Sequence, residues 1–201
     1  MEKHLRTNEE YGDAVKYFDK ISWQTKYQIL HSVESQFNQR VYVSKLEKWR
    51  LLSFVSTPDH SQIQGKVKYN EEDQTFDYSG RCGYIDTMAS AGMSFINEVY
   101  PEETPLKSAK LLFVGLGAGT LPNIFCRSFP ETSIDVVEID PMVAEAAVNY
   151  FGFPKDRTNI FVQDVRDFVQ DSSSSSKKYH SIFFDCYIVN DQGLPADMRT
   201  E

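Results

Sequence analysis

The feature that most constrains this chain is a buried strand that runs into a glycine-rich turn and then into a helix, between residues 110 and 129. Leu111-Leu112-Phe113-Val114 is continuously apolar, as expected of a strand buried on both faces of a sheet. Gly115-Leu116-Gly117-Ala118-Gly119 follows it, and the helix is predicted over Leu121 to Phe129. Glycines at such a turn allow a tight bend and let a ligand approach the free N–H groups of the helix start.

Further strands and helices alternate after this unit, which predicts a parallel sheet with right-handed crossovers. The remaining predicted strands are Ile134–Ile139, Asn159–Val162 and Ser181–Phe184, and the predicted helical segments are Pro141–Tyr150 and Val165–Val169. The sequence therefore predicts an α/β fold in which about Lys110 to Asp185 form the nucleotide-binding half of a Rossmann-like sheet. The serine run at 172–176 is typical of a solvated surface loop.

The first hundred residues predict a smaller unit of mixed structure. Asn8 to about Gln39 is predicted to be helical, because Tyr27, Leu30 and Val33 recur at helical spacing. A small antiparallel sheet and then a helix are predicted over Val41–Val43, Leu51–Val55, Ile63–Tyr69 and Thr75–Tyr78, and over Tyr84–Tyr100. The expected division is an N-terminal unit over residues 1–100 and a Rossmann-like domain over residues 101–201.

Composition restricts the partners and the location. The formal net charge of -8 argues against a broad phosphate-contacting face for nucleic acid. Cys82, Cys126 and Cys186 are far apart and form no CxxC pair, so reduced thiols are expected rather than a disulfide framework or a metal site. The polar N-terminus is unlike a secretory signal, and no apolar stretch approaches the roughly 18 residues that span a bilayer. The expected location is the cytosol or the nucleus, without a membrane partner.

Acidic residues follow the predicted strands at the same edge of the sheet. Glu138 ends the second strand, 19 residues beyond Gly119, where a nucleotide-binding sheet places a carboxylate for the ribose hydroxyls. An exposed acid at a strand end is the alternative. Asp164 follows the third strand and could accept a hydrogen bond from an adenine amino group, with Ile139 and Val165 on the ring faces. Aspartate is also a common helix N-cap, and the two roles are compatible.

Asp185 ends the fourth strand, and open α/β sheets bind ligands at their carboxyl edge. It is therefore the candidate for a catalytic or substrate-facing acid. Cys186 follows it, but a nucleophilic role for this thiol is disfavoured, because no neighbouring cation would lower its pKa and Asp185 and Asp191 flank it.

These motifs resemble the class I S-adenosylmethionine-dependent methyltransferases. Leu112 to Gly119 followed by Val137-Glu138-Ile139-Asp140 is most similar to the spermidine-synthase-like branch, whose second strand reads V-E-I-D. The resemblance extends over most of residues 40–191, through Arg50-Leu51-Leu52, Gln64-Gly65 and Gly83-Tyr84. It implies S-adenosylmethionine or its decarboxylated form as the cofactor, and pairing of two copies through the N-terminal sheet. The implied site comprises Gly115, Gly117, Gly119, Glu138, Ile139, Asp164 and Val165, with Asp185 as the catalytic acid.

Two departures separate this chain from the aminopropyltransferases that it resembles. Those enzymes usually carry G-G-G-D-G-G in the first turn, and Ala118 stands here in place of the aspartate. They also carry D-S-S-D-P after the fourth strand, where Asp185 matches the first acid and Ile188 replaces the second. The acids that would hold a polyamine are therefore incomplete. Methyltransferase-like proteins of the branch, some of which act on proteins, tolerate G-L-G-x-G followed by Leu-Pro, so methyl transfer to a protein or a small amine is the favoured hypothesis.

Three other functions stay open. Aminopropyl transfer to a polyamine would suit an acidic pocket, and a non-catalytic binding or scaffold module would keep the fold without activity. A dehydrogenase is disfavoured, because V-E-I-D followed by proline is not typical of that class. The resemblance implies a sheet of seven strands, of which the sequence predicts four, so a sheet incomplete at its C-terminal side is expected, with transferase activity belonging to the complete chain.

Overall fold

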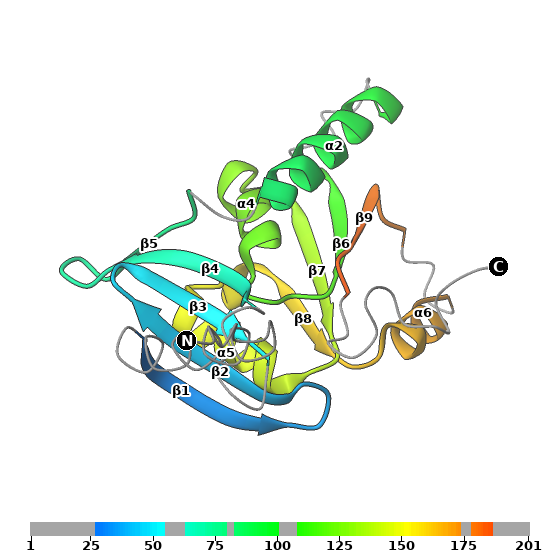
Figure 1. Cartoon of the computed structure of the whole chain (residues 1–201). Coiled ribbons are helices and arrows are strands. Elements are labelled where there is room, and N and C mark those ends of the chain that lie inside the picture. The colour runs from blue at the N-terminus through cyan, green and yellow to red at the C-terminus, as the bar shows by residue number, and fades with distance from the viewer. Residues whose placement is uncertain (1–26, 55–62, 80–82, 101–107, 174–177, 187–201) are drawn as a thin grey trace, which may run out of the picture.

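The computed structural model describes residues 27–54, 63–79, 83–100, 108–173 and 178–186, which form two sheets and the helices around them (Figure 1). The first sheet is antiparallel and keeps chain order, with strands β1 (Gln28–Ser35), β2 (Gln39–Leu46), β3 (Trp49–Ser53), β4 (Ile63–Asn70) and β5 (Thr75–Asp77). The small antiparallel sheet predicted from the sequence is therefore confirmed.

Strand β1 overturns part of the helix predicted for Asn8–Gln39, and the residues before 27 lie outside the described part of the chain. The pairing of β1 with β2 shifts register between Ile29 and His31, as at a β-bulge that inserts one extra residue. Leu30 and Val33 would face opposite sides of a regular strand, yet both pack against the same apolar cluster. The bulge thus gives a strand the apolar spacing of a helix, which explains the wrong prediction.

The second sheet is parallel, with the strand order β8-β7-β6-β9. Its strands are β6 (Lys110–Val114), β7 (Ser133–Glu138), β8 (Asn159–Val162) and β9 (Ser181–Phe184), as the sequence predicts to within a residue. The chain moves outward from β6 through β7 to β8 and then returns to the other side of β6. This reversal beside β6 is where open α/β sheets form a ligand crevice at their carboxyl ends.

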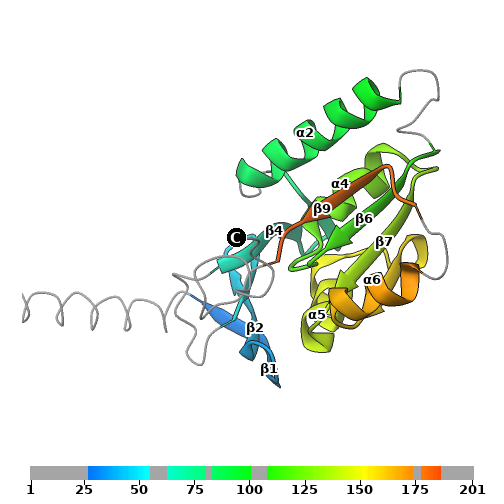
Figure 2. The ribbon, with the colours of Figure 1, turned by 90° about the vertical axis from the view of Figure 1, so that its right-hand side faces the viewer.

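Helices cover both faces of the parallel sheet (Figure 2). The helices are α2 (Gly83–Val99), α4 (Thr120–Ser128), α5 (Pro141–Phe151), the short 3-10 helix η2 (Lys155–Arg157) and α6 (Val165–Ser173). Apolar residues of α2, α4 and α5 join one face of the sheet in a core around Phe113 and Phe125, whereas Phe168 of α6 packs on the other face. Among the described residues, no helix is long and apolar enough to cross a membrane.

The antiparallel sheet shares a core with the second half of the chain. Val41 and Val43 of β2 belong to the same apolar cluster as Phe151 of α5. The guanidinium of Arg50 lies 3.6 Å from the ring centroid of Tyr69, and its Nη1 donates a hydrogen bond of 2.9 Å to the carbonyl of residue 150 at the end of α5. The sheet is therefore packed against α5, and the domain boundary expected at residue 100 stays a prediction.

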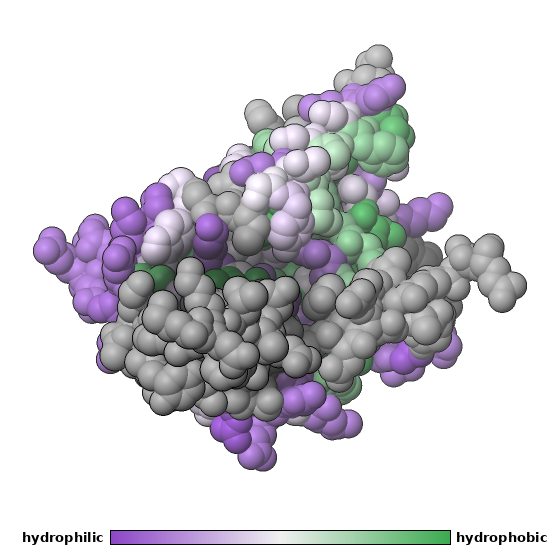
Figure 3. Space-filling model, in the orientation of Figure 1, coloured by the Kyte–Doolittle hydropathy of each residue, from purple (hydrophilic) through white to green (hydrophobic). Residues whose placement is uncertain are grey.

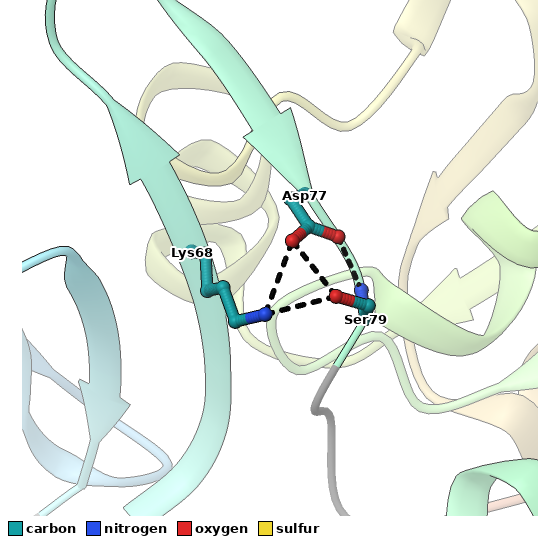
Figure 4. Close-up of polar contacts among 3 residues, drawn as sticks. All are labelled: Lys68, Asp77 and Ser79. Carbon is teal, nitrogen blue, oxygen red and sulfur yellow. Dashed lines mark hydrogen bonds and ion pairs between the residues drawn. The ribbon is translucent and has the colours of Figure 1, made fainter.

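A cluster of polar side chains lies at the end of β5 (Figure 4). The ammonium of Lys68 on β4 lies 3.2 Å from Asp77 Oδ2 and donates a hydrogen bond of 2.9 Å to Ser79 Oγ. Ser79 in turn donates to Asp77 through both its hydroxyl and its backbone N–H, each at 2.7 Å. Hydrogen bonds from Ser79 and then Lys68 lower the pKa of Asp77 to about 2. The cluster links β4, β5 and the chain that leads to α2.

Some large apolar side chains stay on the surface. Phe95 and Val99 of α2 are exposed, and hydrophobic surface is visible over the outer end of this helix (Figure 3). Ile182 and Phe184 of β9 are also exposed. Strand β9 forms one edge of the parallel sheet among the described residues.

Candidate functional site

A cavity of about 660 Å³ opens at the carboxyl ends of the parallel strands. Seven of the eight residues proposed from the sequence line it: Gly115, Gly117, Glu138, Ile139, Asp164, Val165 and Asp185. Gly119 does not line it. The expected crevice beside β6 is therefore present, and it gathers side chains from separate parts of the chain.

The glycines of the turn after β6 have different surroundings. Gly117 has a φ of 55°, and a Cβ built on it would meet no described atom within 4 Å. Gly119 has a φ of 71° at the start of α4, and its Cβ would lie 2.6 Å from the ring of Phe153. A Cβ on Gly115 would collide with the carbonyl of Asp185. Gly117 therefore presents bare backbone to open space, whereas Gly115 and Gly119 permit close packing.

Glu138 at the end of β7 is buried beside this turn. Its Oε2 accepts a hydrogen bond of 2.9 Å from the Leu116 N–H, and its Oε1 accepts one of 2.9 Å from the Asp140 N–H. Burial raises the pKa of Glu138, while backbone N–H groups, including that of Gly117, oppose the rise. An ionised carboxylate has about four acceptor positions, so Glu138 retains capacity for a ligand in the cavity.

Asp164 precedes α6 and caps it, which is the alternative role that the sequence left open. Its Oδ1 accepts a hydrogen bond of 2.8 Å from the Arg166 N–H, and its Oδ2 lies 2.6 Å from Arg166 Nη2. Hydrogen bonding from Arg166 lowers the pKa of Asp164, so its carboxylate is ionised at neutral pH. Both side chains line the cavity, and the guanidinium adds a positive charge to an otherwise acidic rim.

Asp185 at the end of β9 accepts a hydrogen bond of 3.2 Å from the hydroxyl of Tyr84, in the first turn of α2. Desolvation by the surrounding protein raises the pKa of Asp185, and the bond from Tyr84 opposes this rise. A carboxylate with a raised pKa is a better proton acceptor than an ordinary aspartate near neutral pH.

Cys186 lines the same cavity as Glu138, Asp164 and Asp185. Burial raises the pKa of its thiol to about 12, with further increases from Glu138, Asp185 and Asp164, in that order. The thiol is therefore protonated at neutral pH, as expected of a residue without a nucleophilic role.

The structure adds lining residues that the sequence analysis did not propose: Phe37, Asn38, Gln64, Tyr84, Thr120 and Arg166. Phe37 and Asn38 come from the turn between β1 and β2, in a segment predicted to be helical, so no local signal could have placed them here. Thr120 begins α4; its hydroxyl is buried and has no hydrogen-bond partner among the described residues. That hydroxyl is a polar group available to a ligand.

Ala118 is the residue at which the glycine turn departs from the aminopropyltransferase pattern. Its side chain is buried in the apolar cluster shared with the antiparallel sheet. A Cβ built on Gly65 of β4 would lie 2.5 Å from the Cβ of Ala118. Ala118 also lines the cavity, so a methyl group stands there in place of the carboxylate that aminopropyltransferases usually carry.

No protein-family profile matches this chain. Individual proteins of known function are similar to it over different lengths. A polyamine aminopropyltransferase of Vibrio vulnificus is 33% identical over 173 residues, which are 86% of this chain and 52% of that protein. An eEF1A lysine and N-terminal methyltransferase of Mus musculus is 37% identical over 117 residues, which are 56% of this chain and 16% of that protein. The chain thus spans about half of the first relative and a smaller part of the second.

Among solved structures, a probable spermidine synthase from Corynebacterium glutamicum superposes with a TM-score of 0.52 at 17% identity. The match covers 70% of this chain and 47% of that one, and it shows a common fold. The sheet order, the glycine turn and the sequence relatives agree with one another. The chain is therefore related to the spermidine-synthase-like branch of the class I S-adenosylmethionine-dependent methyltransferase superfamily.

Proposed function

We propose that the cavity binds S-adenosylmethionine and that the complete protein transfers its methyl group to a protein or a small amine. The observation that carries this proposal is the meeting of the bare Gly117 backbone with the carboxylates of Glu138 and Asp164 in one cavity. In the proposed complex the ribose hydroxyls donate to Glu138 and the adenine amino group donates to Asp164. Ile139 and Val165 contact the ring faces, while Gly115 and Gly119 shape the turn.

Asp185 is the proposed catalytic acid–base residue, and Tyr84 orients it through the hydrogen bond to Oδ2. When bound, the cofactor would supply the methyl group of its sulfonium to the acceptor nitrogen and would leave as S-adenosylhomocysteine, a neutral thioether. The proton that the nitrogen loses passes to the carboxylate of Asp185. Proximity and orientation supply most of the rate in such a reaction.

Aminopropyl transfer from the decarboxylated cofactor to a polyamine is the second candidate. The aminopropyltransferase relative matches 86% of this chain, and the carboxylates of Glu138, Asp164 and Asp185 line one cavity. Ala118 favours methyl transfer, because aminopropyltransferases usually carry an aspartate at this position. A non-catalytic binding or scaffold module is the third candidate.

Calorimetric titration of the whole chain with both forms of the cofactor separates these candidates. Tighter binding of S-adenosylmethionine than of its decarboxylated form supports methyl transfer, and the reverse order supports aminopropyl transfer. If neither form of the cofactor binds, both transfer hypotheses are overturned and the non-catalytic binding or scaffold module is left. Glu138→Ala should weaken binding by about 1–3 kcal/mol, because it leaves hydrogen-bonding groups without partners. Glu145→Ala, on the exposed side of α5, is the matched control and should bind as the wild type does.

We also propose a cytosolic setting, a domain boundary near residue 100 and assembly of two copies through the antiparallel sheet. The free thiols of Cys126 and Cys186 support the reducing compartment. Size-exclusion chromatography with light scattering tests the assembly, and a monomer at micromolar concentration would contradict it.

A further inference from the structure

The turn between β1 and β2 reaches the cavity from the antiparallel sheet. Phe37 and Asn38 of this turn line the same cavity as Glu138 and Ile139. Phe37 is 43% exposed although it is large and apolar. We propose that Phe37 is a ligand-contacting residue that covers the nucleoside in this cavity, and that Asp140 is the positioning residue that holds the turn there. This inference rests on the proposed function, and it assigns the specificity for the aromatic base to a residue outside the parallel sheet.

The turn is closed by hydrogen bonds within itself. The hydroxyl oxygen of Ser35 accepts from the backbone N–H of Phe37 at 3.0 Å and from that of Asn38 at 2.9 Å. The same hydroxyl donates to Oδ2 of Asp140, and Asn38 Nδ2 donates to that oxygen at 2.6 Å. The backbone that carries Phe37 is therefore fixed to Asp140, more than a hundred residues further along the chain.

Asp140 connects this turn to the rest of the site. Asp140 is fully buried. Its second oxygen accepts a hydrogen bond of 2.9 Å from the Met142 N–H, and through this bond Asp140 caps α5. Its own N–H donates to Glu138 Oε1 at 2.9 Å. One residue thus joins the turn, the start of a helix and the carboxylate proposed for the ribose. The backbone that carries Phe37 is consequently held in place relative to Glu138.

The chemistry of Phe37 suits an aromatic ligand. Ile139, at the same cavity, is also large, apolar and 39% exposed. When a flat, weakly polar ligand covers apolar side chains that contact water, the free energy of the system falls. A nucleobase offers such a surface, and it stacks favourably on an aromatic ring. Two exposed apolar side chains from different elements therefore favour a nucleoside over a purely polar ligand.

Calorimetric titration of the whole chain with S-adenosylhomocysteine tests the contact. Phe37→Ala should weaken binding about tenfold, the usual consequence of removing a ring that stacks on a base. Phe37→Tyr keeps the ring and should bind within about twofold of the wild type. Phe95→Ala removes a comparably exposed ring on α2, away from the cavity, and should bind as the wild type does. Equal affinity of Phe37→Ala and the wild type would overturn this inference and leave the proposed function intact. Absence of wild-type binding would overturn both.

Exchange of the side chains of Asp140 and Asn38 tests the role of Asp140. Asp140→Asn retains an oxygen that can cap α5, but its new amide nitrogen faces the donating amide of Asn38. Affinity should fall about two- to tenfold, the range of one net hydrogen bond. Adding Asn38→Asp restores the hydrogen bond between residues 38 and 140 with donor and acceptor exchanged, while the Ser35 hydroxyl still lacks its acceptor, so part of the affinity should return. A merely structural role would lower thermal stability without this rescue, so failure of the double variant to regain affinity contradicts the positioning role.

Discussion

Gly117 and Gly119 share a left-handed backbone but not the same surroundings, so alanine should affect them differently. Gly119→Ala adds backbone strain of about 1–2 kcal/mol and a clash with Phe153 of about 1–3 kcal/mol. Gly117→Ala adds the strain alone and places its methyl group in open space beside the cavity. Urea denaturation should therefore show the larger loss of stability for Gly119→Ala. Titration with cofactor should show the larger loss of affinity for Gly117→Ala relative to the stability lost, and equal effects of both variants would refute this assignment.

Thr120 offers a second prediction at the scale of one residue. Its buried hydroxyl lacks a hydrogen-bond partner among the described residues, which costs about 1–3 kcal/mol relative to a satisfied group. Thr120→Val keeps the shape and removes the hydroxyl. The midpoint temperature of thermal unfolding of the ligand-free protein should rise by a few degrees. The affinity for S-adenosylmethionine should fall if the hydroxyl forms a hydrogen bond with the ligand. Stabilisation without a change in affinity would show that the hydroxyl does not contact the cofactor.

Most elements of the second half could be predicted because each carries its own local signal. Strand β6 is a continuous apolar run, and the acids that follow β7, β8 and β9 occupy positions set by the parallel topology. Strand β1 could not be predicted, because a bulge at Leu30 imitates helical spacing. Phe37 could not be predicted either. It reaches the cavity only through the pairing of β1 with β2 and the distant contact with Asp140.

The attachment of the antiparallel sheet to α5 depends on a geometry specific to arginine. Arg50 is planar, stacks over Tyr69 and donates to the carbonyl of residue 150 at the same time. Arg50→Lys keeps the charge but loses the stacked fork, so the free energy of unfolding should fall by about 1–2 kcal/mol in urea denaturation. Arg40→Lys, at the exposed pair with Glu34, is the matched control and should change stability by less than about 0.5 kcal/mol. Similar losses from both variants would contradict this account of the attachment.

The candidate site belongs to the whole molecule, since its lining comes from both sheets and from helices on either side of the parallel one. Such a site places carboxylates in opposite environments. Glu138 and Asp185 have raised pKa values because of burial, whereas hydrogen bonding from Arg166 lowers the pKa of Asp164. Outside the cavity, hydrogen bonds from Ser79 and then Lys68 lower the pKa of Asp77. These shifts act on stability in different ranges of pH.

The shifts of Glu138 and Asp185 and the shift of Asp77 therefore act on the stability of the ligand-free protein on opposite sides of the ordinary carboxylate pKa, about 4. Above that pH the folded protein retains protons on Glu138 and Asp185 that the unfolded chain has lost, so stability falls as pH rises through the raised pKa values. Below it the unfolded chain binds protons that Asp77 resists down to about pH 2, so stability falls as pH decreases. Thermal unfolding should be measured across this range to give a curve of stability against pH. Asp185→Asn should flatten only the part of the curve above about pH 4 (the upper limb), and Asp77→Asn only the part below it (the lower limb). An upper limb that is unchanged in Asp185→Asn, or a lower limb that is unchanged in Asp77→Asn, would contradict these assignments.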